Sequence, residues 1–408
     1  MAGVLSVPAR VASLRTTTAF RGLACTDCEA SFSPGDASHR CPDCGGLLEA
    51  AYDHDAAAVT AADLEPRHDA GLGRYAALLP VPADALVSMG EGATPLVDCP
   101  TLAEDLGVGR ALVKDEGRNP TGSVRDREMA VAVTAAAEAG ATDAGLPPTG
   151  NGGQAMAAYA ARAGLDSHSF APSRMPFVNK AMINVHGGDM SVGEGRYGDS
   201  ARVYAEEAED GWYDLTAFET PFRQEGQKTL AYEIAADLDW TTPDHVVVPT
   251  GHGLAITGLH RGFRDLREVG LLDETPALHA AQATGCAPIA DAFEEGRDTH
   301  EPVERPDTIA GAIEIADPTG SRFALDAVRE TDGSAVASED RDVLEAAVDV
   351  AQSSGLEVSA ATGAAVAGAR TLADDGAFEG GDTVVVLNTA TGNKDDDILR
   401  SHLMSKGI

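Results

Sequence analysis

The chain has 408 residues, which is long enough for roughly two or three domains with a large buried core. It carries 65 acidic residues against 30 basic ones, a formal net charge of −35, so no basic stripe exists to meet the phosphates of a nucleic acid. No apolar run approaches the roughly 20 residues that a membrane-spanning helix needs, and no membrane partner is expected. The N-terminal residues lack a continuous apolar core of signal-peptide length, so we expect a cytoplasmic protein.

The acidic excess extends along the whole chain, and lysines are few, standing only at positions 114, 180, 228, 394 and 406. Such a composition, rich in Ala, Asp and Glu, is typical of halophilic proteins. A highly acidic surface stays hydrated in concentrated salt, where the repulsion between its charges is screened. The charge therefore indicates a solvated surface in a salt-rich cell.

Four of the six cysteines form two Cys-x-x-Cys pairs near the N-terminus. Cys25 and Cys28 make the first pair, and Cys41 and Cys44 make the second after a separation typical of zinc ribbons. Four thiolates close the tetrahedral coordination of Zn²⁺ and leave no open position, so the predicted metal is structural. We therefore expect a zinc ribbon at residues 20–52, with tight turns at the glycines that follow Cys44.

After the ribbon, residues 53–87 are predicted to form a linker with a short helix. From residue 88 onward the chain alternates strand-like and helix-like runs. Helices are predicted over 130–140 and 154–164, a strand over 245–249 with a helix over 254–269, and a strand over 383–387. This alternation favours an α/β fold with mostly parallel sheets, and we expect one region over 88–408 with two α/β subdomains.

The segment at 114–130, KDEGRNPTGSVRDREMA, resembles a motif of threonine synthases and related pyridoxal phosphate (PLP) enzymes of the tryptophan synthase β type. That family reads N-P-T-G-S-F-K-D-R, and its Lys forms the Schiff base with the cofactor. In this chain Arg125 stands at the position of that Lys. A short ribbon ahead of the catalytic region is also similar to many threonine synthases.

Further segments match the family in the same order along the chain. They begin with SMGEGATPL at 88–96 and continue with TGN at 149–151, PFRQEGQKT at 221–229, QATGCAP at 282–288 and NTATGNKD at 388–395. The resemblance implies a two-domain, tryptophan synthase β-like PLP fold with the ligand site between its subdomains. It also implies that Asn151 binds the ring hydroxyl of PLP and that Thr389 binds its pyridine nitrogen.

Gly251, His252 and Gly253 lie between the predicted strand and the predicted helix, an arrangement that can bind a phosphate. Amides at a helix N-terminus point outward and the helix dipole favours an anion, while glycines permit close approach. Taken alone, the turn is better explained as an ordinary tight connection between a strand and a helix. The spacing does not fit a dinucleotide fingerprint, and its place among the matched segments favours the phosphate site.

Several residues around the expected pocket depart from the family. His252 and Leu254 replace small or amide residues, which narrows the phosphate turn. Pro147 and Pro148 remove hydrogen-bond donors before Asn151. The later V-E-P-A-S motif becomes VSAAT at 358–362, which removes a carboxylate.

Arg125 changes the expected chemistry, because a guanidinium stays protonated and can be neither nucleophile nor base. Two interpretations remain open: Arg125 forms an ion pair with Asp126 or another carboxylate, or it binds a ligand phosphate or carboxylate bidentately. Lys114 belongs to a matched segment in which it is ordinarily structural. Cys99 and Cys286 are expected to be small core residues.

The resemblance implies an ancestral conversion of O-phosphohomoserine to threonine, a PLP-dependent elimination and replacement catalysed by a lyase. We expect a threonine synthase-like protein with impaired turnover that binds PLP non-covalently. The alternative is a non-catalytic paralogue that binds a small phosphorylated amino-acid-like ligand or regulates a true threonine synthase. A homodimer is expected by analogy with relatives.

Overall fold

The computed structural model describes residues 14–36, 39–65 and 70–407. Most of the N-terminal segment considered for a signal peptide lies outside these residues, as do positions 66–69 of the predicted linker. The chain folds as two compact units. Unit 1 comprises Met1–Asp63, Arg67–Glu91 and Arg125–Gly226, and unit 2 comprises Leu64–Pro66, Gly92–Val124 and Gln227–Ile408.

Unit 1 begins with a small antiparallel sheet that carries the cysteine pairs. Its strand order is β2-β1-β3, with β1 at Phe20–Cys25, β2 at Ser31–Phe32 and β3 at Leu48–Tyr52. The predicted linker then contains three short 3-10 helices in its described part, at His54–Ala56, Ala61–Leu64 and Gly71–Leu78.

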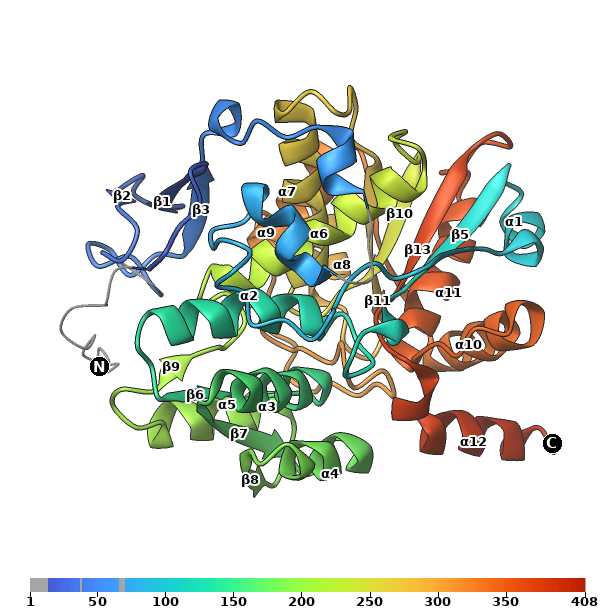
Figure 1. Ribbon diagram of the computed structural model, residues 1–408. Helices are drawn as coiled ribbons and strands as arrows, with labels where there is room; N and C mark the ends of the chain where they lie inside the picture. Colours follow the sequence, from blue (N-terminus) through green and yellow to red (C-terminus); the bar gives the residue numbers. More distant parts are fainter. Residues whose placement is uncertain (1–13, 37–38, 66–69, 408) are drawn as a thin grey trace. The chain divides into compact units, whose positions relative to one another are not determined.

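The second sheet of unit 1 is parallel throughout and has the order β8-β7-β6-β9. Its strands are β6 (Asp143–Leu146), β7 (Asp166–Pro172), β8 (Asp189–Gly193) and β9 (Tyr213–Asp214). The accompanying helices are α2 (Arg125–Glu138), α3 (Asn151–Ala163), α4 (Phe177–Val185) and α5 (Tyr197–Glu207). Helix α3 packs on both α2 and β7 (Figure 1). Helix α6 (Phe222–Asp237) begins in unit 1 and continues into unit 2.

Unit 2 is built on a six-stranded sheet with the order β12-β11-β10-β13-β5-β4, which is parallel except for the edge strand β4. The strands are β4 (Leu96–Asp98), β5 (Arg110–Asp115), β10 (His245–Pro249), β11 (Ala277–Ala283), β12 (Ala335–Ser338) and β13 (Thr383–Asn388). Its helices are α1 (Pro100–Leu106), α7 (Leu254–Glu268), α8 (Pro288–Glu294), α9 (Ser321–Glu330), α10 (Asp340–Ser354), α11 (Ala360–Asp374) and α12 (Asp396–Ser405), with 3-10 turns at Glu116–Arg118 and Gly392–Lys394.

Burial explains why the central strands of this sheet are so apolar. Strands β10 and β13, side by side in Figure 1, are covered on both faces, and their valines are fully buried. Small residues of α11 fit close against β10 and β11; a Cβ at Gly368, for example, would lie 3.1 Å from the Cβ of Ala281. One large core cluster of unit 2 lies between this sheet and helices α1, α10 and α11.

The sequence predictions of α/β layers with parallel sheets are confirmed. The strand at 245–249 is β10, the strand at 383–387 is β13, and the helices at 154–164 and 254–269 are α3 and α7. The helix predicted at 130–140 exists but begins earlier, at Arg125. Strand β6 ends at Leu146, so the two prolines follow the strand and remove no hydrogen bond from it.

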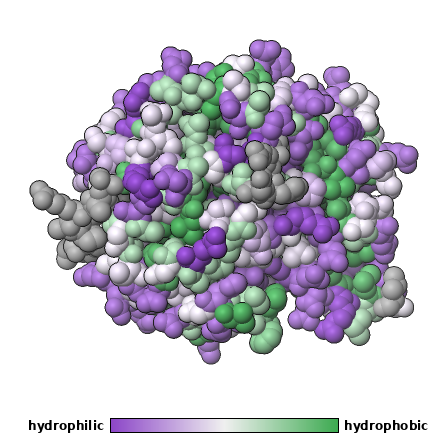
Figure 2. Space-filling view, in the orientation of Figure 1, coloured by the Kyte–Doolittle hydropathy of each residue, from purple (hydrophilic) through white to green (hydrophobic). Residues whose placement is uncertain are grey.

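Polar residues cover most of the face shown in Figure 2, as the acidic composition leads one to expect. Among the described residues, no helix combines the length and the apolar character needed to cross a membrane.

Candidate functional site

The four predicted zinc ligands come together in unit 1. Their sulfur atoms all lie within 4.8 Å of one another. The Sγ atoms of Cys25 and Cys44 are 3.5 Å apart, and those of Cys28 and Cys41 are 3.7 Å apart. Zn–S bonds of about 2.3 Å in a tetrahedron place neighbouring sulfurs about 3.8 Å apart, so the cluster fits a four-thiolate zinc site.

The backbone around the cysteines also suits thiolate ligands. The amide of Asp27 donates to Cys25 Sγ and that of Gly46 donates to Cys44 Sγ, both at 3.4 Å. A Cβ on Gly46 would lie 2.9 Å from Cys25 Sγ, so a larger residue there would displace the sulfur. The cluster is therefore consistent with a zinc ribbon, as predicted.

In unit 2, the turn predicted to bind a phosphate, residues 251–253, connects β10 to α7. Gly253 is the N-cap of α7 with φ 95°, a conformation that favours glycine, and no side chain caps the helix. The hydroxyl of Thr257 in the first helical turn is buried and has no hydrogen-bond partner among the described residues. Uncapped amides and a buried hydroxyl together provide the donors that a phosphate requires.

Thr389 lies at the same end of the strands as that turn, the end formed by their last residues. It directly follows β13, which is the parallel neighbour of β10. Its N–H donates to Thr362 Oγ1 at 3.2 Å and its carbonyl accepts from the Val124 amide at 2.9 Å, so the backbone is held on both sides. The structure thus brings Thr389 to the carboxyl end of the strand beside Gly251 and Gly253.

Arg125 and Asn151 lie in unit 1, each as the first residue of a helix. Arg125 pairs through Nη1 with Oε1 of Glu128, one turn along α2. The other oxygen of Glu128 accepts from Nε and Nη2 of Arg223, at 2.9 and 2.6 Å. Glu128 is fully buried, whereas the side chains of Arg125 and Arg223 are 24% and 7% exposed. The three residues form what we call the Arg–Glu–Arg cluster.

The cluster keeps one net positive charge. Burial alone would raise the pKa of Glu128, but the guanidinium groups of Arg125 and Arg223 hold it below the usual carboxyl value. Glu128 is therefore ionised at neutral pH, and both of its oxygens are occupied. Arg223 also donates through Nη1 to the Leu215 carbonyl at 2.6 Å.

Arg223 also lies near the start of α3. A Cβ added to Gly152, next to Asn151, would lie 4.0 Å from Nη2 of Arg223. The amide oxygen of Asn151 accepts from Nδ2 of Asn179 at 3.1 Å. Asn179 is 1% exposed and donates from the same nitrogen to Gln154 at 3.0 Å. With its oxygen occupied, Asn151 presents its NH₂ group as a donor.

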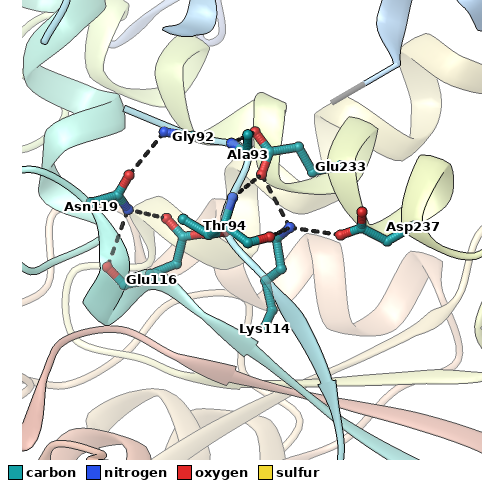
Figure 3. Close-up of polar contacts among 8 residues, drawn as sticks. All are labelled: Gly92, Ala93, Thr94, Lys114, Glu116, Asn119, Glu233 and Asp237. Atoms are coloured by element: carbon teal, nitrogen blue, oxygen red, sulfur yellow. Dashed lines mark hydrogen bonds and ion pairs between the residues drawn. The ribbon is translucent and has the colours of Figure 1, made fainter. Parts of the chain in front are cut away.

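Two of the lysines, Lys180 and Lys114, have partners within their own units. Unit 1 contains one lysine among its described residues, Lys180, which donates to the Ser173 carbonyl at 2.6 Å. Lys114, fully buried in unit 2, donates to the Thr94 carbonyl at 2.7 Å and pairs with Glu233 and Asp237 at 3.1 and 2.9 Å (Figure 3). This arrangement suits the structural role expected of Lys114.

The chain matches known proteins over most of its length. Residues 87–390 match the family described as "Pyridoxal-phosphate dependent enzyme". The chain therefore belongs to the pyridoxal-phosphate-dependent enzymes, and its fold is the type II fold of that class.

Within this class the chain belongs to the threonine synthase family. It is 37% identical to the threonine synthase of Methanosarcina acetivorans over 369 residues, which cover 90% of each protein. It is 35% identical to the threonine synthase of Methanocaldococcus jannaschii over 376 residues, covering 91% of this chain and 93% of that protein.

Solved structures support the fold. Diaminopropionate ammonia lyase from Escherichia coli has a TM-score of 0.67 at 17% identity, covering 78% of this chain and 89% of that one. A fungal L-serine ammonia-lyase from Rhizomucor miehei has a TM-score of 0.66 at 21% identity, covering 77% of this chain and 98% of that one.

Sequence reasoning missed three residues of the candidate site. Glu128 stands three positions after Arg125, a spacing that brings helical side chains together, and could have been found. Arg223 lies in a matched segment but had been given no role. Nothing in the sequence singled out Asn179.

Proposed function

We propose that the protein is a threonine synthase-like member of the family that binds PLP non-covalently and has impaired turnover of O-phosphohomoserine. The observation that carries this proposal is the Arg–Glu–Arg cluster. Arg125 stands at the position of the family's Schiff-base Lys, and its guanidinium is paired with a buried carboxylate. The ligand class is a small phosphorylated amino acid, as in the conversion of O-phosphohomoserine to threonine that the resemblance implies.

The proposed cofactor contacts use side-chain donors for which the described residues of the same unit provide no acceptor. The phosphate would be held by the amides after Gly253 and by the Thr257 hydroxyl, the ring hydroxyl by Asn151, and the pyridine nitrogen by Thr389. When bound, PLP supplies an electron sink for chemistry at the carbon next to an amino group.

The cluster explains why turnover should be impaired. A guanidinium cannot form the covalent bond to the cofactor aldehyde that an amine forms, and it cannot accept a proton at neutral pH. Glu128 is no substitute as a base, because both of its oxygens accept hydrogen bonds from guanidinium groups. Loss of a general base alone typically lowers a rate by about 10²–10⁴-fold.

Equilibrium dialysis of the full-length protein against PLP tests the binding part of this proposal. We expect saturable binding that inorganic phosphate competes away, and the absence of any saturable binding would rule the proposal out. Expression in a threonine auxotroph tests turnover. Growth equal to that given by an active threonine synthase would contradict the proposed impairment.

The second candidate is a non-catalytic paralogue that binds a phosphorylated metabolite or regulates a true threonine synthase. The net positive charge of the Arg–Glu–Arg cluster favours it, because a partly exposed Arg125 can still bind a phosphate or carboxylate. Dialysis against O-phosphohomoserine without PLP separates the candidates. Binding under that condition favours the paralogue, whereas binding only after PLP favours the first candidate.

The metal, the domain boundaries, the location and the oligomeric state of the protein are proposed as well. We propose a structural zinc ion in the ribbon at 20–52, a linker at 53–87 and a PLP-type region at 88–408. The acidic composition supports a halophilic, cytoplasmic protein, and a homodimer is proposed by analogy with relatives.

A further inference from the structure

The ribbon, residues 20–52, holds both sides of the short segment that carries Arg223. On one side, Arg40 pairs with Glu219 through two bonds, Nε to Oε2 at 2.7 Å and a shorter one from Nη2 to Oε1. On the other side, the hydroxyl of Tyr52, the last residue of β3, donates to Oε2 of Glu225. Arg223 lies between these two anchored carboxylates.

The first anchor adjoins the cysteine cluster. Arg40 directly precedes Cys41, and the ring of His39 packs against that of Tyr213 with centroids 4.6 Å apart. The side chains of Arg40 and Glu219 are 39% and 25% exposed, so the pair is partly shielded from water. A two-bond guanidinium–carboxylate contact fixes orientation as well as distance.

From the anchored segment, contacts lead directly to the Arg–Glu–Arg cluster. Arg223 binds Glu128 through two nitrogens and the Leu215 carbonyl through the third, and Glu128 binds Arg125. A shift of the segment would therefore move Arg223 relative to Glu128. Bonds of this kind depend steeply on distance and angle.

We infer that the metal-loaded ribbon positions Arg223, so that zinc occupancy controls ligand binding at the Arg–Glu–Arg cluster. Arg40 and Tyr52 are positioning residues in this scheme, because they act through Glu219 and Glu225. A bound zinc ion fixes the backbone at Cys41 and with it the side chain of Arg40. The ligand part of the inference rests on the proposed function, whereas the coupling between ribbon and Arg223 does not.

The test compares Arg40→Gln and Tyr52→Phe with Arg21→Gln in the full-length, zinc-loaded protein. Arg21→Gln is a matched control, because Arg21 also pairs with a carboxylate, but with that of Asp53 and not with the two carboxylates that anchor the Arg223 segment. All four cysteines remain, so the ribbon keeps its ligands. Zinc removal by a chelator, followed by zinc addition, gives a reversible version of the same perturbation.

Two readouts keep the outcomes distinct. Amide hydrogen exchange at residues 215–226 should become roughly tenfold faster in Arg40→Gln and on zinc removal, which corresponds to a decrease of about 1.4 kcal/mol in the free energy of local opening. Zinc addition should restore the original exchange rate. Unchanged exchange there, with faster exchange inside the ribbon, would overturn the coupling. PLP affinity, measured by dialysis, should fall roughly three- to tenfold in Arg40→Gln and stay constant in Arg21→Gln.

The failure of the proposed function gives a different pattern. If no variant and no wild-type protein binds PLP, the proposed function is wrong while the exchange data still decide the coupling. If PLP binds equally well to wild type and Arg40→Gln, with or without zinc, control of ligand binding by the ribbon is excluded.

Discussion

Glu128→Gln removes the only negative charge of the Arg–Glu–Arg cluster and is the most informative stability test. In the wild-type protein Glu128 accepts three guanidinium hydrogen bonds and is fully buried. Removing one partner of a buried ion pair costs roughly 3–5 kcal/mol, because the remaining charge is left buried. Since Arg125 is 24% exposed and keeps some water, we expect a loss near the lower end, about 3 kcal/mol.

The assay is chemical denaturation at one fixed salt concentration, because salt alone changes charge interactions. Glu206→Gln is the matched control in the same unit: its pair with Arg202 is 3.8 Å long and both side chains are more than 60% exposed, at 66% and 63%. Exposed pairs typically contribute about 0–1 kcal/mol. A loss in Glu128→Gln no larger than in Glu206→Gln would refute the reasoning.

The pH dependence of this difference has a defined sign. The folded pKa of Glu128 lies below the usual carboxyl value, so its contribution is complete above about pH 4.3. As pH falls through the lower folded pKa, the carboxylate takes up a proton and the contribution is lost. The stability difference between wild type and Glu128→Gln should therefore shrink in acid.

Asn179→Leu removes the donor to Asn151 Oδ1, and we expect roughly tenfold weaker PLP binding by dialysis, since one hydrogen bond contributes about 1 kcal/mol and an orphaned partner adds to the loss. Equal affinity would mean that Asn151 is oriented by other contacts. Burial is the main cause, and the nearby His245 a smaller one, that lowers the pKa of His279 from 6.5 to about 3. Because the unfolded chain binds a proton at this histidine more readily than the folded protein does, the folded protein should lose stability as pH falls from 6.5 toward 3. His279→Gln should make the free energy of unfolding less dependent on pH in this range. An unaltered slope would contradict the lowered pKa of His279. Cys44→Ser should reduce the zinc content, measured by metal analysis, to well below one ion per chain. Full zinc occupancy in this variant would exclude the four-thiolate site.

Local patterns predicted the fold well. The valine run at 245–249 and the apolar run at 383–387 are buried strands because both faces of the sheet are covered. The paired cysteines predicted their own cluster, since the spacing of a ribbon is a local property. By contrast, the Ala-rich run predicted a helix only from residue 130, whereas α2 begins at Arg125 and its first turn contains the fully buried charged residues Asp126 and Arg127.

The contacts that define the candidate site were harder to predict, because they join residues far apart in the sequence. Glu128 and Arg223 are 95 positions apart, and Asn151 and Asn179 are 28 apart. Only the folded chain brings such pairs together. The choice between Asp126 and another carboxylate as partner of Arg125 also depended on helix geometry, in which the side chain three positions along lies on the same face.

The most direct test of the central claim is mass spectrometry after borohydride reduction of PLP-saturated protein, comparing wild type with Arg125→Lys. Borohydride makes a lysine–PLP bond permanent, so each adduct can be assigned to a residue. We predict no adduct in the wild-type protein and one adduct at position 125 in the variant. A stoichiometric adduct on any lysine of the wild-type protein would contradict the proposal that Arg125 leaves this chain without the cofactor-binding amine.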